Sequence, residues 1–176
     1  MNQKARTQKF EGLANEYSDD LYRFAVWLCK DPTLARDLVQ ETFLRAWRAI
    51  DRLRDDKAAK GWLLVILRRE FARTFERKVP EIRDLDDYVI AADDSMEPEN
   101  RAEKRMLRQG MMSLEPKYRE PLLLQVIGGF SCKEIADELG ISRSAVMTQL
   151  FRARHKLKAV LDADDSEQHD NVHELS

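Results

Sequence analysis

An acidic segment over residues 79–99 divides the chain in two, and this segment constrains the fold more than any other feature. Eight of its residues are Asp or Glu, only Arg83 is basic, and a proline lies near each end. A stretch with one sign of charge and few apolar residues cannot bury enough surface to offset the entropy of ordering its backbone. We therefore expect two small domains, over residues 1–78 and 100–161, joined by an acidic flexible linker over 79–99.

Charge is distributed unevenly along the 176 residues. The whole chain carries a formal charge of −2, of which segment 79–99 contributes −7 and the stretch 162–176 contributes −6. The remaining residues therefore carry +11, in two basic regions separated by an acidic one. This distribution favours binding to a polyanion. The stretch 162–176 is predicted to be an acidic, disordered tail.

The apolar residues on both sides of segment 79–99 follow the spacing of amphipathic helices. From Phe10 to Leu28 they recur at i, i+3, i+4 and i+7, and residues 38–50 and 61–78 predict two further helices. Helical spacing resumes after residue 99, and no period-two strand pattern is present. The predicted fold class is all-α.

The end of the second basic region has the features of a helix-turn-helix. Ser131 and Glu134 predict a capping box that opens a short helix. Gly140 suits the left-handed turn between the helices, and Ser142 caps a longer helix that is predicted to end near Leu161.

The longer of these helices has five Lys or Arg residues and no acidic residue between positions 141 and 159. Polar residues near its N-terminus are suited to reading base edges in the major groove, with the later cations beside phosphates. A plain basic helix in an αα-hairpin is the alternative interpretation.

A second basic stripe lies on the helix predicted for residues 61–78. Arg69, Arg73 and Arg77 recur every four residues, with Phe71 and Phe75 between them. Such a stripe can follow a phosphate backbone while the rings stack on unpaired bases. A solvated face over a phenylalanine-lined core explains the pattern equally well.

Several motifs resemble those of bacterial extracytoplasmic-function (ECF) sigma factors of the sigma-70 family. Residues 37–47, DLVQETFLRAW, are similar to the family's core-polymerase-binding signature, and Trp62-Leu63 followed by Arg68-Arg69 resembles its −10 element helix. Residues 114–120, 130–136 and 151–154 are similar to the family's fourth region. The resemblance covers roughly residues 10–161.

The resemblance implies an alternative-sigma transcription initiation factor that directs core RNA polymerase to promoters and assists promoter melting. The first domain would bind the polymerase clamp helices and the −10 element, and the second would meet the flap and read the −35 element. The matching positions for core polymerase are Asp37, Gln40, Glu41, Phe43, Leu44 and Trp47. Those for the −10 element are Lys57, Lys60, Trp62, Arg68, Arg69, Arg73 and Arg77. Those for the −35 element are Arg143, Ser144, Met147, Thr148, Phe151, Arg152 and Arg154.

Some positions depart from the family pattern. The loop before Trp62, which often carries an aromatic residue, reads Lys-Ala-Ala-Lys, and Arg69 replaces a frequent Asn. Met147 and Gln149 stand where the family has Lys and Arg. With fewer cations, the helix should hold phosphates less strongly.

The resemblance also implies a cytoplasmic stress-response regulator whose partners are core RNA polymerase, promoter DNA and an anti-sigma factor that can hold it at the inner membrane. The sequence itself has no apolar run long enough to span a membrane and no secretory signal.

An enzyme is not expected, since no nucleophile–base pair, glycine-rich phosphate loop or metal-ligand spacing is present, and no cofactor or metal is predicted. Two non-enzyme alternatives remain: a conventional helix-turn-helix regulator, and a sigma-like decoy that sequesters an anti-sigma factor. Cys29 and Cys132 are predicted to be ordinary thiols, with a redox switch as the alternative.

Overall fold

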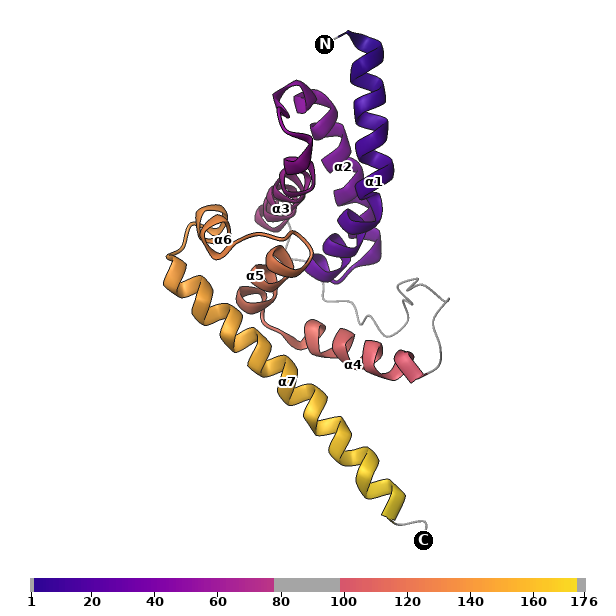
Figure 1. Ribbon diagram of the computed structural model, residues 1–176, viewed down its shortest axis with the longest axis vertical. Coiled ribbons are helices and arrows are strands. Elements are labelled where there is room, and N and C mark those ends of the chain that lie inside the picture. Colours follow the sequence, from indigo (N-terminus) through magenta and orange to yellow (C-terminus); the bar gives the residue numbers. More distant parts are fainter. Residues whose placement is uncertain (1, 78–98, 174–176) are drawn as a thin grey trace.

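The computed structural model describes residues 2–77 and 99–173, and this part of the chain is helical without strands (Figure 1). The N-terminal group contains α1 (Gln3–Cys29), α2 (Pro32–Ala49), the 3₁₀ turns η1 (Ile50–Arg52) and η2 (Asp56–Ala58), and α3 (Ala59–Arg77). The C-terminal group contains α4 (Glu99–Ser113), α5 (Pro116–Val126), α6 (Cys132–Leu139) and α7 (Arg143–His173). The all-α prediction is confirmed. The predicted linker lies outside the described residues except for Glu99, where α4 begins.

Local capping explains where the first helices begin. Helix α1 begins at Gln3, ahead of the apolar spacing that starts at Phe10, and the side chain of Asn2 caps it by accepting a hydrogen bond from the Ala5 amide at 2.8 Å. Helix α2 begins at Pro32: the Asp31 carboxylate caps it, and Pro32 occupies its first turn, where the missing N–H costs nothing.

The predicted helix-turn-helix is confirmed in its local chemistry. Ser131 and Glu134 form the reciprocal capping box, and Gly140 ends α6 with φ of 67°. The Ser142 hydroxyl then accepts from the Ala145 amide at 3.1 Å and caps α7.

The C-terminal end of α7 differs from the prediction. The helix continues to His173 instead of ending near Leu161, so it includes residues 162–173 of the segment predicted to be an acidic tail. They contain neither glycine nor proline, the residues that most strongly end a helix.

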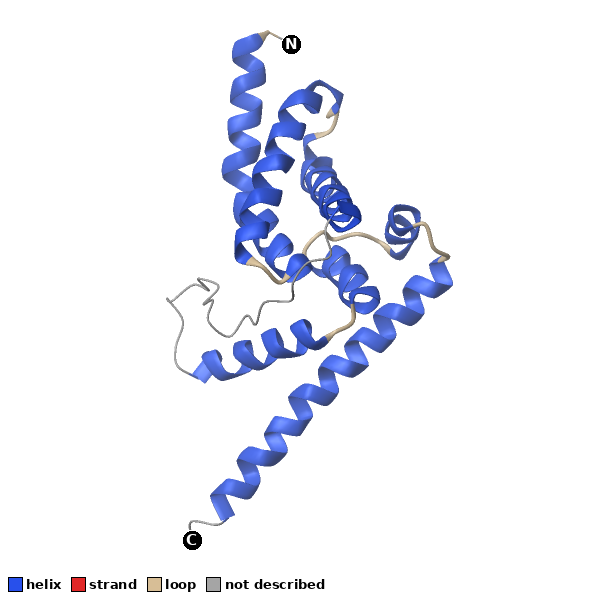
Figure 2. Cartoon of the chain, turned by 180° about the vertical axis from the view of Figure 1, so that it is seen from behind, coloured by secondary structure: helices blue, strands red, loops and turns tan. Residues whose placement is uncertain are grey.

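The two helix groups share one buried core. Leu21, Phe24 and Leu28 of α1 belong to the same buried cluster as three leucines of α3 and the Leu122–Leu124 run of α5. Helix α5 lies beside the C-terminal end of α1, and the view from behind shows the same arrangement (Figure 2). The sequence predicted two domains, and the structure packs them against each other.

Candidate functional site

Four of the residues predicted to bind polymerase line a groove between α2 and α1: Gln40, Phe43, Leu44 and Trp47. Asp37, Gln40 and Leu44 are exposed, and the Leu44 side chain is unusual for a large apolar residue in being 48% exposed. Phe43 and Trp47 are half-buried in an apolar groove of about 610 Å³ between α1 and α2. The groove lining includes Phe10, Tyr22, Val39, Phe43, Leu44 and Trp47.

Trp47 is held in place by residues of α1. The Phe10 ring packs edge-on against it with centroids 5.3 Å apart, and the Arg6 guanidinium lies 4.9 Å from the centre of its ring. Arg6 also donates to the Trp47 carbonyl oxygen at 2.9 Å. Trp47 is therefore a fixed wall of the groove, whereas Leu44 is exposed to a partner.

The acidic residue Glu41 has a neighbour within the fold. Its carboxylate forms an ion pair with Arg45 at 3.0 Å, and Arg45 also reaches the buried carboxylate of Glu70 on α3 at 2.7 Å. Glu70 in turn pairs with Arg73 at 2.6 Å. One predicted DNA-binding arginine, Arg73, is thus linked through Glu70 to the face of α2 that carries Glu41.

The other residues predicted for the −10 element lie in different surroundings. Lys57 on η2 is exposed, Lys60 forms an ion pair with Asp20 of α1 at 2.6 Å, and Trp62 is half-buried against the core. Arg77 lies in the last turn of α3, and its side chain is outside the described part.

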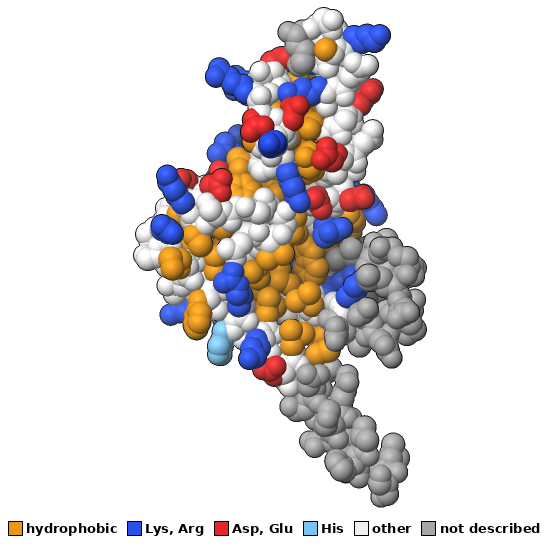
Figure 3. Space-filling view, viewed as in Figure 1, with side chains coloured by type: hydrophobic (Ala, Val, Ile, Leu, Met, Phe, Trp, Pro, Cys, Tyr) orange, Lys and Arg blue, Asp and Glu red, His pale blue; other side chains and the backbone are white. Residues whose placement is uncertain are grey.

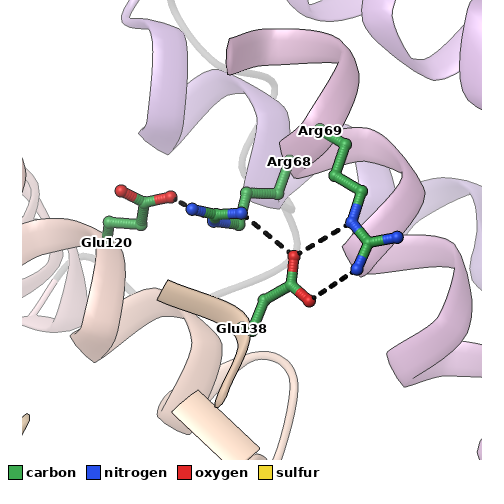
Figure 4. Close-up of polar contacts among 4 residues, drawn as sticks. All are labelled: Arg68, Arg69, Glu120 and Glu138. Atoms are coloured by element: carbon green, nitrogen blue, oxygen red, sulfur yellow. Dashed lines mark hydrogen bonds and ion pairs between the residues drawn. The ribbon is translucent and has the colours of Figure 1, made fainter. Parts of the chain in front are cut away.

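Arg68 and Arg69 are engaged by carboxylates of the C-terminal group (Figure 4). Arg68 lies 2.6 Å from Glu120 of α5 and 3.0 Å from Glu138 of α6, and Arg69 lies 3.0 Å from the second oxygen of Glu138. These contacts join the helix predicted to bind the −10 element to the domain predicted to read the −35 element.

Helix α7 exposes every residue that was predicted to contact the −35 element. Val146, Leu150 and Ala153 bury its opposite side, which fixes the orientation of the helix. Met147 and Phe151 are 55% and 68% exposed. In the space-filling view, Lys and Arg side chains alternate with protruding apolar ones along the edge formed by α7 (Figure 3).

Two of the α7 arginines already have partners on α5. Arg152 hydrogen-bonds to Tyr118, which lowers the pKa of the tyrosine hydroxyl, and Arg154 hydrogen-bonds to the side-chain oxygen of Gln125. Thr148 donates to the Ser144 carbonyl oxygen at 3.0 Å. The first turns of α7 are therefore more available to a ligand than the arginines that follow them.

Four residues that join the two groups were not predicted from the sequence. Arg119 is buried and donates to the carbonyl oxygens of Leu114 and Leu28, at 2.6 and 3.4 Å. Glu120 and Glu138 hold the α3 arginines, and the Phe130 ring lies against Gly61, where an added Cβ would sit 3.4 Å from it. Nothing in the local sequence distinguishes Arg119, which stands between Tyr118 and Glu120 before the apolar run of α5.

The cysteines and carboxylates do not form a metal centre in residues 2–77 and 99–173, where no group of three or more possible ligands occurs. Burial raises the pKa of the Cys29 thiol to about 11, which keeps it protonated. Among the described helices, none is both long and apolar enough to cross a bilayer.

Comparison with known proteins assigns both groups to one family. Residues 13–79 match the family model for sigma-70 region 2, and residues 104–157 match the model for sigma-70 region 4. SigM of Bacillus subtilis, an ECF RNA polymerase sigma factor, is 34% identical over 147 residues, which cover 82% of this chain and 90% of SigM. EcfG of Rhodopseudomonas palustris is 32% identical over 148 residues, covering 84% of this chain and 82% of EcfG.

Solved structures show the same fold. CnrH in complex with the cytosolic domain of CnrY superposes with a TM-score of 0.60 at 29% identity, over 93% of this chain and 91% of CnrH. The sigma factor RpoE of Bartonella quintana, solved with the anti-sigma factor NepR, superposes with a TM-score of 0.67 at 24% identity, over 88% of this chain and 98% of RpoE. The two helix groups, their order along the chain and these relatives together establish that the chain belongs to the ECF sigma factors of the sigma-70 family.

Proposed function

We propose that this alternative sigma factor uses α2 to bind the clamp helices of core RNA polymerase, α3 to bind and help melt the −10 element, and α7 to read the −35 element. The observation that carries the proposal is the exposure of all seven −35 candidates on one side of α7, in a chain that also has a region 2 domain. A conventional helix-turn-helix regulator has no need of a polymerase-binding domain.

Transcription with purified core RNA polymerase tests the proposal. Promoters are first identified by sequencing transcript 5′ ends after controlled overexpression, and single-round transcription is then measured on those templates. We expect transcripts only when the chain is added to core polymerase. A decoy that sequesters an anti-sigma factor would give no transcript, and neither would a conventional regulator.

The proposed polymerase contact on α2 has its own test. Reversing two charges, Asp37→Arg with Glu41→Arg, should abolish co-elution with core polymerase, because the carboxylates steer a basic partner toward the apolar groove. The matched control is Glu11→Arg with Glu16→Arg, which reverses two charges on the exposed side of α1. Circular dichroism verifies that both variants are folded. Co-elution of the α2 variant at the level of the control would rule out α2 as the contact.

A protein partner that covers these surfaces is also part of the proposal. Such a factor acts on RNA polymerase in the cytoplasm, and an anti-sigma factor would hold it at the inner membrane. The solved relative CnrH supports this because its bound partner is the cytosolic domain of CnrY. A candidate anti-sigma factor must both bind the purified chain and suppress its transcript in the single-round assay.

A further inference from the structure

We infer that Glu138 and Glu120 act as internal competitors for promoter DNA, holding the −10 arginines of α3 until the two domains separate. This inference rests on the proposed role of α3 in DNA binding. It adds a specific pair of carboxylates that would keep the free factor from binding DNA before it meets polymerase.

Arg68 and Arg69 bind the Glu138 carboxylate in the way that arginines bind a phosphate group. One carboxylate oxygen accepts from Arg69 Nε at 3.3 Å and from Arg68 Nη1 at 3.0 Å, and the other accepts from Arg69 Nη2 at 3.0 Å (Figure 4). Arg69 therefore donates through two nitrogens of its planar fork, which is the arrangement that guanidinium groups also use for phosphates. A phosphate cannot take this position on Arg69 while Glu138 occupies it.

Glu120 completes the contact on the neighbouring arginine. Its carboxylate lies 2.6 Å from Arg68 Nε, so the Arg68 guanidinium is shared between two carboxylates of the C-terminal group. The Arg68 side chain is only 18% exposed and that of Glu138 10% exposed, and ion pairs so shielded from water are screened little by salt. Arg69 remains 61% exposed, so a negatively charged strand can approach it from solvent.

The surrounding packing keeps these groups together. Phe130 lies against Gly61 at the N-terminal end of α3, and Arg119 hydrogen-bonds to the carbonyl oxygen at Leu28 of α1. The carboxylates are therefore presented by a packed interface between the domains. A two-nitrogen contact of Arg69 with a phosphate, and any contact of DNA with Arg68, requires that this interface open or that the carboxylates lose their charge.

Binding of single-stranded DNA to the free full-length chain tests the inference. The probe is a fluorescein-labelled oligonucleotide of about 20 nucleotides and mixed sequence, which such basic, aromatic surfaces bind without strict sequence preference. Anisotropy at about 50 mM salt, where phosphate contacts are strong, gives the dissociation constant. We expect Glu138→Gln to tighten binding about fivefold, since removal of the charge releases Arg69 and leaves Arg68 with one carboxylate instead of two.

The matched control is Asp137→Asn, which removes the same charge from the adjacent, exposed position of α6. It should change the dissociation constant by less than about twofold, because long-range charge effects are small at this distance and salt. Glu120→Gln, on a different helix, should tighten binding by a smaller factor, because it frees Arg68 from only one of its two carboxylates. Thermal unfolding followed by circular dichroism verifies that each variant is folded.

Equal affinities of the wild type and Glu138→Gln, or equal gains in Glu138→Gln and Asp137→Asn, would overturn the inference. If Glu138→Gln does not fold, the inference is tested by Glu120→Gln alone. An affinity of Glu120→Gln equal to that of the wild type would then overturn it. These outcomes are separate from failure of the proposed function, which would appear as the absence of a transcript from wild-type chain with core polymerase. A gain in Glu138→Gln that exceeds the control supports the inference.

Discussion

Burial decides the chemistry of Cys29, and it argues against a redox switch at this position. The thiol donates to the Asp31 carbonyl oxygen at 3.1 Å near the junction of α1 and α5, and its pKa of about 11 arises mainly from loss of solvent. Only about one thiol in a thousand would be ionised at pH 8, and the thiolate is the reactive form. The raised pKa is therefore a local property of Cys29 and the residues around it.

We predict that iodoacetamide will modify Cys29 slowly at pH 8 in the native protein and rapidly in urea. The reason is that unfolding restores an ordinary thiol pKa, so the fraction of thiolate rises. Peptide mass spectrometry at timed intervals follows each cysteine separately. Equally rapid modification with and without urea would show that the thiol is accessible and ionised in the folded chain.

Under the proposed function, helix α7 has two tasks, base reading and phosphate contact, and its buried side decides which residues are placed for each. Val146 and Leu150 anchor the first turns, so Arg143 and Met147 project from the exposed side at the N-terminal end. Arg152 comes later and is already hydrogen-bonded to Tyr118. The N-terminal end of a recognition helix enters the major groove, while later residues approach the backbone.

We predict different effects for Arg143→Ala and Arg152→Ala in the holoenzyme. Arg143→Ala should change which −35 sequences are used, by about 1–3 kcal/mol if the arginine makes a bidentate contact to guanine. Arg152→Ala should weaken all −35 sequences alike and reduce the salt dependence of binding by about one phosphate contact.

Promoter fragments that differ only in the −35 element, titrated with holoenzyme at several salt concentrations, give both quantities. Lys158→Ala, on the exposed side of α7 farther from the helix N-terminus, is the control for loss of a cation. Identical sequence profiles for Arg143→Ala and Arg152→Ala would mean that α7 lies in the groove in another orientation.

At the scale of the whole molecule, Arg119 connects the two domains by donating hydrogen bonds to backbone carbonyl oxygens in both of them. Its guanidinium satisfies the carbonyl oxygen of Leu114 in its own group and that of Leu28 at the end of α1. Burial lowers the pKa of this guanidinium, but an arginine remains cationic at neutral pH. Such a charge is costly to bury, and the hydrogen bond to Leu28 helps to offset the cost only while the domains are packed.

We predict that Arg119→Met will lower the free energy of unfolding by about 2 kcal/mol, because two carbonyl oxygens lose a charged donor. Lys117→Met, an exposed position on the same helix, should change it by less than about 0.5 kcal/mol. Urea denaturation measures both. Hydrogen exchange at the C-terminal end of α1 should also become faster in Arg119→Met, and unchanged exchange there would show that Arg119 does not hold the domains together.

Features that depend on neighbouring residues were predictable from the sequence alone. The caps at Asp31 and Ser131, the turn at Gly140 and the exposed side of α7 all follow from side chains within one or two helical turns of each other. The motifs of the sigma-70 family were also readable as ordered local patterns, and the family is confirmed. The assignments of individual residues to polymerase and DNA remain predictions.

Only the tertiary structure showed what the charged residues of α3 meet. Arg68 lies 52 residues from Glu120 and 70 from Glu138 along the chain, and an ion pair at such a separation leaves no periodic trace in either segment. The burial of Arg119 has the same origin, since its guanidinium reaches the carbonyl oxygen of Leu28 in the other helix group. Helical spacing specifies which side of a helix is buried, but the partner that covers it is chosen by the packing of complete surfaces.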